Sequence, residues 1–543
     1  MSHSIRKILV TLLFASISSA GQAANPGRPA KPAPAWQTSI DALYAPAAPL
    51  LWFIAASPTV SALAVVDELA AAESRGLDAA DYDVEAVRAL LTNPGTPGDP
   101  IAQRMLDQRL SRSVAHFVAD LHAGRVAPRE VGHDLDVPHA TLDLAVAIKA
   151  LAGARDPKTV LDDFEPGFQH YDLLKVALRR YRQLALDPTL TILPPLPARS
   201  VKLGEAYSGA TALRRLLTAL GDMPDSVAGA VAGSTPVAED AILDVTLSEG
   251  LKKFQDRHGV NIDGALGPAT FRLLTTPLTR RVKQIEYSLE RARWLPPRLE
   301  SPPILVNIPQ FRLFAFSTTT DREDSLLQMR VVVGKVYPRN NTPVFAADLR
   351  YIVLRPYWDV PRTIFLNEFM PRIQTNPGWL TANNFEIVAG EGDDGRIQPA
   401  TPENLAALAS GAFRLRQKPG RSNALGVAKF LFPNSHNVYL HGTTAQGLFA
   451  EPRRAFSHGC VRLEDPLLLA EFLLRNEPGW NRAAIDAAAA GNAARRINLT
   501  TPVRVFIMYA TAIATEAGNM LFFEDIYGHD AKLAAALARH QRR

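Results

Sequence analysis

The residue types best suited to covalent chemistry gather in one segment of the chain. His441 and Gly442 are followed, after a spacer, by Ser457-His458-Gly459-Cys460-Val461-Arg462. A cysteine nucleophile needs thiolate character, which a nearby histidine supplies by accepting the proton. Backbone N–H groups beside the sulfur stabilise the oxyanion of a tetrahedral intermediate. The segment therefore predicts nucleophilic catalysis, with Cys460 as nucleophile and His441 as base.

Cys460 is the single cysteine among 543 residues. A lone thiol forms no disulfide within its own chain, and in an arbitrary protein it is often a small buried hydrophobe. If Cys460 were only a buried hydrophobe, the two histidines and several glycines close to it in the sequence would be there by chance. A zinc site is the other alternative, but the segment offers no obvious fourth ligand and no C-x-x-C or H-E-x-x-H spacing. A catalytic cysteine is favoured over both.

Flanking residues indicate how these groups are positioned. Asn437 to Leu440 predicts a strand whose end carries His441 toward a loop mouth. Asp465 and Pro466 are typical of a helix N-cap and first helical position, and an apolar run follows them. We therefore expect the thiol in a tight glycine-containing turn before a helix, where backbone N–H groups can converge on an anion.

The pattern around this segment predicts a β-rich domain that begins near Ile304, where the apolar period becomes two. The expected strands are a hairpin of 305–308 with 312–316, then 329–334 and 350–354, and a closing strand at 503–509. Residues 361–420, rich in Pro, Gly and Asn with one short helix at 403–408, indicate an insertion between strands. A final helix from Asp530 is expected on the surface.

Composition limits the class of protein. Hydrophobic residues make up 47% and charged residues 21%, as in soluble globular proteins, and a chain this long predicts several domains. The net charge of +5 favours loose association with an anionic polymer. Lys and Arg form no block, so nucleic-acid binding is not indicated.

The amino-terminal residues have the order of a secretory signal. Arg6 and Lys7 precede an apolar run, which is followed by small residues up to Ala23. The run is too short to span a bilayer, so residues 1–23 are expected to be cleaved rather than to anchor the protein. Residues 24–35 are rich in Pro, Gly and Ala and predict a flexible lead.

Two helical modules are expected between the lead and the β-rich domain. Residues 36–200 show three- and four-residue apolar spacing, typical of an all-α scaffold. Farther on, an amphipathic helix around Phe254-Gln255 ends at Gly259, and Asp263-Gly264 with Gly267 turns the chain into another helix. This stretch, within residues 208–276, resembles the peptidoglycan-binding-domain-1 family, which implies a three-helix module that binds cell wall or has kept only the packing.

The cysteine segment resembles the signature of the L,D-transpeptidase catalytic domain, or YkuD domain. The resemblance extends through Val306-Asn307-Ile308-Pro309, Val333-Gly334-Lys335, Thr342-Pro343-Val344-Phe345, Pro356-Tyr357-Trp358-Asp359-Val360-Pro361 and Asn423 to Phe430. It implies a multidomain α+β protein of the large Gram-negative subgroup. Its parts are the all-α scaffold (36–200), the peptidoglycan-binding-like module (208–276), a catalytic domain (302–510) with a capping insertion (361–420), and a C-terminal segment (511–543).

The resemblance also assigns roles to single residues. Cys460 is the implied nucleophile and His441 the general base, with the Gly442 carbonyl orienting its imidazole. His458 and Gly459 are implied to shape the oxyanion pocket together with the Cys460 amide. Arg462 is expected either to hold a substrate carboxylate or to pin the turn, and Tyr357 and Trp358 either to line the donor channel or to belong to the sheet core.

The implied reaction takes place in the periplasm on peptidoglycan stem peptides. Cys460 attacks the carbonyl at the L-centre of meso-diaminopimelate in a tetrapeptide and expels D-Ala, and the thioester is then attacked by the D-centre amine of a second stem. The result is a 3,3 cross-link formed without a metal or organic cofactor. Water or a lipoprotein Lys are alternative acceptors, and carbapenems are expected to acylate the same thiol. The alternative that is not an enzyme is a wall-binding scaffold protein without catalytic activity.

Overall fold

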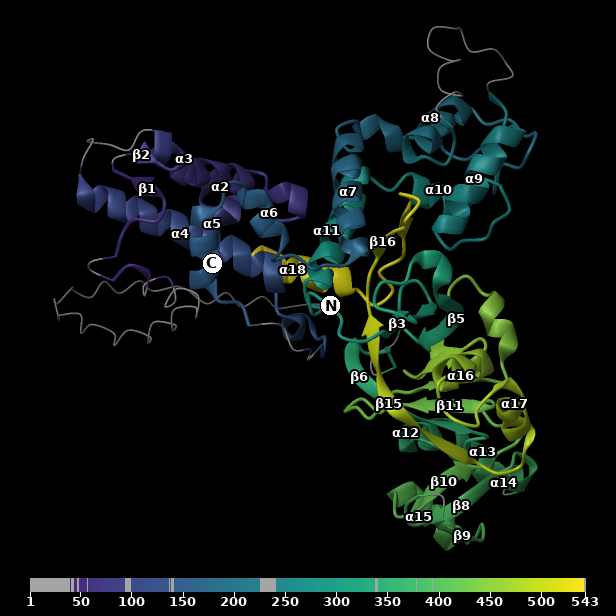
Figure 1. The fold of residues 1–543 in the computed structure, drawn as a ribbon. Coiled ribbons are helices and arrows are strands. Elements are labelled where there is room, and N and C mark those ends of the chain that lie inside the picture. Colours follow the sequence, from purple (N-terminus) through teal and green to yellow (C-terminus); the bar gives the residue numbers. More distant parts are fainter. Residues whose placement is uncertain are drawn as a thin grey trace, which may run out of the picture.

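The computed structural model describes residues 40–541, with gaps at 41–42, 46–47, 56, 93–98, 136, 138–140, 225–240, 337–339, 377 and 393. The expected signal segment and flexible lead lie outside these residues. Figure 1 shows two groups of helices and, below them in this view, a β-rich lobe. The multidomain α+β fold is confirmed.

The first helical module packs around the long helix α4, whose buried face carries Leu110, Val114, Phe117 and Leu121. Asp99 caps this helix by accepting from the Ile101 amide at 2.9 Å. The elements of the module are β1 (Phe53–Ile54), β2 (Ser57–Pro58), α2 (Val60–Ala70), η1 (Ala72–Arg75), η2 (Ala79–Tyr82), α3 (Val84–Thr92), α4 (Pro100–Ala123), η3 (Pro128–Val131), α5 (Leu144–Gly153) and α6 (Pro157–Asp162).

A second core joins segments far apart in the chain. Helix α7, which lies in the range expected for the scaffold, packs here against α11, and so does a C-terminal hairpin that the sequence pattern did not predict. Met520 and Phe522 of that hairpin are buried among the helices. The elements are α7 (Gln169–Leu184), η4 (Pro188–Thr191), α8 (Ala210–Leu220), α9 (Val245–Arg257), α10 (Pro268–Leu274), α11 (Leu278–Ala292), β16 (Ala512–Ala514) and β17 (Met520–Phe522).

The Phe254-Gln255 and Asp263-Gly264 motif has a structural role in this second core. The side-chain Nε2 of Gln255 donates to Asp263 Oδ1 at 2.8 Å. Its side-chain Oε1 accepts from the backbone amide of Gly264 at 2.8 Å. Gly264 has a φ of +67°, which L side chains rarely adopt, so glycine suits the turn. These contacts explain the motif as packing and leave glycan binding as a prediction.

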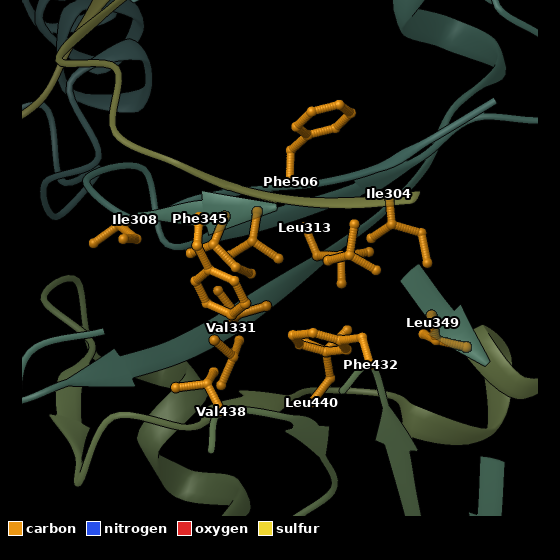
Figure 2. Packing of buried hydrophobic residues seen from close by; sticks show 14 of the residues in the cluster. Ile304, Ile308, Leu313, Val331, Phe345, Leu349, Phe432, Val438, Leu440 and Phe506 are labelled. Carbon is orange, nitrogen blue, oxygen red and sulfur yellow. The ribbon is translucent and has the colours of Figure 1, made fainter. Parts of the chain in front are cut away.

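The β-rich lobe is a closed sheet. Among the described residues, nine strands are hydrogen-bonded in the order β13-β5-β14-β12-β11-β6-β15-β3-β4, and β4 pairs again with β5. The strands are β3 (Ile304–Asn307), β4 (Arg312–Ala315), β5 (Leu327–Gly334), β6 (Phe345–Leu354), β11 (Ala428–Leu431), β12 (Leu440–His441), β13 (Ala455–Ser457), β14 (Val461–Leu463) and β15 (Arg495–Met508). Figure 2 shows Val331, Phe345, Phe432 and Leu440 meeting inside this sheet. Burial of these side chains stabilises the closed sheet, and the strands on either side of the cysteine turn belong to that sheet.

Most expected strands are present, with shifted ends. The hairpin is confirmed, with Leu305 opposite Phe314. Helix α16 (Pro466–Leu474) begins as predicted, since Asp465 accepts from the Leu468 amide at 2.9 Å. Strand β14 lies between Cys460 and this helix, so the turn that carries the thiol comes before the helix with a short strand in between.

The insertion at 361–420 is a folded subdomain and not an irregular loop with one helix. Its four-stranded sheet has the order β7-β10-β8-β9, and its own core includes Phe369, Phe385 and Leu415. Sequence pattern missed these strands because they are short and pair over long separations. The elements are β7 (Trp358–Asp359), α12 (Arg362–Ile364), the π-helix η8 (Phe365–Phe369), α13 (Met370–Thr375), α14 (Trp379–Ala382), β8 (Phe385–Ala389), β9 (Arg396–Gln398), α15 (Pro402–Ser410) and β10 (Arg414–Gln417).

The remaining elements are η7 (Glu323–Ser325), η9 (Gln446–Ala450), α17 (Arg482–Ala490) and the last helix, α18 (His529–His540). The expectation of a surface helix at the C-terminus is only half right. Leu533, Ala536 and Leu537 are buried, and the helix contacts η3 and α11. Figure 1 shows α18 in yellow crossing from the β-rich lobe to the scaffold helices.

Arg293, directly after α11, is fully buried and joins three segments. It donates to the Tyr171 hydroxyl at 2.8 Å and to the Arg75 carbonyl, and it lies 3.4 Å from the Glu290 carboxylate. Arg293→Met removes one of the two cations that face the buried Glu290 carboxylate and takes a donor from the Tyr171 hydroxyl and the Arg75 carbonyl, so we expect a loss of about 3–5 kcal/mol in stability and a lower Tm in thermal denaturation. The exposed Arg298→Met is the matched control. Equal Tm values for both variants would contradict this role.

Candidate active site

Parallel pairing of two short strands brings the predicted base and nucleophile together. His441 ends β12, and Cys460 lies in the turn between β13 and β14. Strand β12 runs parallel to β14, with Leu440 opposite Val461 and His441 opposite Arg462. The turn that carries the thiol is therefore next to the strand that carries the imidazole.

The His441 ring is buried and oriented by its own chain. Its Nδ1 lies 2.5 Å from the Gly442 carbonyl oxygen, so Nδ1 carries the proton and donates it. The other nitrogen, Nε2, is then the one that accepts. Burial lowers the pKa of His441 to about 3, and the charges of Arg462 and Lys429 act in the same direction. The imidazole is therefore neutral at physiological pH and able to take a proton.

The Cys460 thiol is half-buried, and its Sγ lies 3.8 Å from the Asn437 carbonyl oxygen. Burial raises the pKa of this thiol, whereas hydrogen bonds from Tyr439 and the charges of Lys429 and Arg462 oppose the rise. Desolvation is the largest effect, so both the thiol and the imidazole of His441 are neutral at rest.

The turn before Cys460 is fixed by hydroxyl groups. Ser457 Oγ donates to the Cys460 carbonyl at 2.5 Å and accepts from the Gly459 amide at 3.1 Å. Thr342 Oγ1 donates to the Gly459 carbonyl at 2.7 Å and accepts from the Gly334 amide at 2.9 Å. Gly459 has a φ of +120°, which favours glycine. Because the Gly459 amide already donates to Ser457 Oγ, the backbone amide of Cys460 is the better candidate donor to an oxyanion.

His458 points toward the capping insertion. Its Nε2 lies 2.7 Å from Glu368 Oε1, and Glu368 belongs to the π-helix η8 of the insertion. π-Helical turns often occur at functional sites. The residue predicted to shape the oxyanion pocket thus also links the cysteine turn to the subdomain above it.

The two aromatic candidates have different surroundings. The Trp358 ring packs 5.9 Å from that of Phe369 in the insertion core, and its side chain hydrogen-bonds Tyr439, which in turn contacts Cys460. The Tyr357 ring is covered by the Arg416 guanidinium at 4.1 Å. Trp358 therefore connects the insertion to the thiol, whereas Tyr357 packs beside the insertion sheet.

Comparison with known proteins agrees with this geometry. Residues 302–505, which include Cys460 and His441, match the family described as the L,D-transpeptidase catalytic domain, YkuD. This part of the chain is similar to L,D-transpeptidase catalytic domains. Residues 38–178 match the Scaffold domain family. A Haemophilus influenzae protein named "Putative L,D-transpeptidase" is 34% identical over 233 residues, which are 43% of this chain and 45% of that relative, so the match spans about half of the relative's length.

Two charged or polar groups near the cysteine turn were missed from the sequence. Lys429 lies opposite His441 in the register, with its Nζ 4.1 Å from the centre of the Tyr439 ring. Tyr439 sits two positions before His441 and hydrogen-bonds the thiol. Alternation along the strand is the one local pattern that places Tyr439 on the same face as His441. No pattern of neighbouring residues in the sequence predicts that Lys429 lies next to Tyr439 and His441.

The described part of the chain has no helix that is both long and apolar enough to cross a membrane.

The electrostatics predict how the thiol responds to pH. Because burial raises its pKa above the ordinary value of 9.0, alkylation of Cys460 by iodoacetamide should be slow at neutral pH and still rise beyond pH 9. No step near the usual histidine pKa is expected, since His441 stays neutral there. Lys429→Met removes a charge that favours the thiolate and should move the profile to higher pH. The exposed Lys418→Met is the control, and a plateau reached by pH 7 would contradict a neutral resting pair.

Proposed function

We propose that this protein is an exported L,D-transpeptidase that forms 3,3 cross-links between meso-diaminopimelate residues of peptidoglycan stems. The observation that carries the proposal is a lone thiol in the turn next to strand β12, whose His441 imidazole has Nδ1 fixed by the Gly442 carbonyl, within residues that match the L,D-transpeptidase family. Such an imidazole accepts the thiol proton through Nε2. Export rests on the amino-terminal sequence and on the wall substrate.

In the proposed reaction the Cys460 sulfur attacks the stem carbonyl at the L-centre as His441 Nε2 takes the thiol proton. The oxyanion is stabilised by the Cys460 amide. His441 then returns the proton to the departing D-Ala amine, leaving a thioester. The D-centre amine of a second stem attacks next, gives up a proton to His441, and the thiol is restored as the cross-link forms.

The acceptor decides the product. Water in place of the second stem would give an L,D-carboxypeptidase, and a lipoprotein Lys would give wall attachment. The Trp358–Tyr439–Cys460 connection and the contact of Glu368 with His458 support a role for the insertion as a cap over the thiol. A covered thioester is protected from water, which favours an amine acceptor.

Wall association is proposed for the region around the small helical module. A cleft of about 2040 Å³ lies beside α9, α10 and α11 and reaches strands β4 and β5. Arg272, Arg280, Lys283 and Arg312 are among its lining residues, and they suit the carboxylates of stem peptides. Neither Cys460 nor His441 lines this cleft, so we assign it to holding the polymer and not to the reaction.

The rival function is a wall-binding scaffold without catalysis. Incubation of diaminopimelate-type muropeptides with pure protein distinguishes the two. We expect 3,3-linked dimers by mass spectrometry with the wild type, and a loss of at least about 1000-fold with Cys460→Ala, because the covalent route disappears. Meropenem should likewise add to the wild type but not to Cys460→Ala. A Cys460→Ala variant that forms dimers normally would refute the nucleophile, and an inert wild type would favour the scaffold.

The capping insertion should act as a lid through Glu368. Glu368→Ala removes its contact with His458, and we expect turnover to fall roughly tenfold to 100-fold through poorer alignment of the cysteine turn. Tm should be unchanged, since both side chains are half-exposed. Glu403→Ala, an exposed change in the same insertion, is the control. Turnover equal to wild type in Glu368→Ala would exclude this route.

A further inference from the structure

A group of metal-ligating side chains lies in the scaffold, apart from the active site. His116 and Asp120 are four residues apart on α4, so they share one helix face. His540, at the end of α18, meets them from the opposite end of the chain. The two histidines are 424 positions apart in sequence, which is why no local motif indicated a metal.

The distances among these three side chains suit a bound ion. His116 Nε2 lies 3.4 Å from His540 Nε2, and Asp120 Oδ2 lies 3.5 Å and 3.9 Å from the two nitrogens. A tetrahedral zinc ion with bonds of about 2.0–2.1 Å separates its ligand atoms by about 3.3 Å. A direct imidazolium–carboxylate hydrogen bond is shorter, about 2.7–2.9 Å. The spacing is thus closer to ligands around an ion than to a direct ion pair.

The surroundings hold the ligands in place. The Tyr82 hydroxyl donates to Asp120 Oδ2 at 3.0 Å, and the His116 ring also hydrogen-bonds the Asp81 backbone. Backbone contacts of this kind orient metal-binding histidines in known zinc sites. At the far end, Gln541 donates to Asp78 at 2.7 Å, which fixes the end of α18 beside the same loop.

Burial and charge are also compatible with a cation. The Asp120 side chain is 6% exposed and both histidine side chains are 26% exposed, so the carboxylate is deep and the imidazoles reach solvent. An ion can enter from that side, and water can take the fourth position. The nearby positive charge, Arg125, lies 3.6 Å from both the Asp81 and Glu290 carboxylates, which offset it.

We propose that His116, Asp120 and His540 bind one zinc ion, which clamps the C-terminal helix α18 to scaffold helix α4. Nitrogen and carboxylate ligands in this number are those that zinc prefers. Because Leu533, Ala536 and Leu537 of α18 also pack in the core of the closed sheet, the ion fixes the scaffold relative to the β-rich lobe. The site is independent of the transpeptidase reaction and is expected to be structural.

Isothermal titration with zinc chloride tests the site on the chelator-treated full chain. Cys460→Ala serves as the parent protein for these variants. It removes the one thiol, a group that would compete for zinc in the titration. We expect one zinc per chain, and His116→Ala or His540→Ala should weaken binding by roughly 100-fold or more. His122→Ala, on the same helix but outside the cluster, should bind as the parent does. Cobalt should show the visible absorption of a tetrahedral ion in the parent and in His122→Ala, and lose it in His116→Ala and His540→Ala.

Thermal denaturation gives a second readout that does not depend on activity. Zinc should raise the Tm of the parent and leave that of His540→Ala unchanged, since only a folded site gains from the ion. His540 ends the last helix, so its replacement removes a ligand without opening a core. A parent that takes up no zinc, or a His540→Ala variant that binds it equally well, would overturn the site and leave an imidazole–carboxylate cluster.

Discussion

The chemistry of this domain depends on two residues of strand β12 lying parallel to β14. That pairing sets His441 opposite Arg462 and so puts the imidazole beside the turn that ends in Cys460. So short a pairing has little stability of its own. It persists because β5, β11 and the rest of the closed sheet hold both strands from either side. The barrel is therefore the support that positions the base and the nucleophile.

Electrostatics at this junction reflect competition between burial and charge. Desolvation disfavours both the thiolate and the imidazolium, while Lys429 and Arg462 favour the thiolate and disfavour the imidazolium. An ion pair at rest would need to overcome both burial terms. A neutral thiol and a neutral imidazole avoid that cost.

The parts of the chain are assembled by buried polar links as well as by apolar cores. Arg293 joins α11 to α7 and η1, and the segment after α4 enters the barrel core through Val126, Val131 and Leu135. The C-terminal hairpin and α18 then return to the helical modules. Scaffold and catalytic domain thus share side chains in one continuous structure, which transmits any constraint on α18 to both.

Local features of the sequence determined what depends on neighbouring residues. The β3–β4 hairpin, the Asp465 cap of α16 and the glycine at position 459 each follow from contacts within a few residues. The hairpin, the cap and the turn could be predicted because such features are decided by short-range geometry. The sequence also named Cys460 and His441 as nucleophile and base, and these roles stay a prediction.

Only the tertiary structure decided which distant groups meet. Thr342 bridges Gly334 and Gly459, Glu368 reaches His458, and His540 joins His116 across 424 positions. The folded insertion and the β16–β17 hairpin likewise depend on partners far along the chain. Such contacts form when burial of apolar surface compensates the entropy of closing long loops, and no local pattern records which loops close.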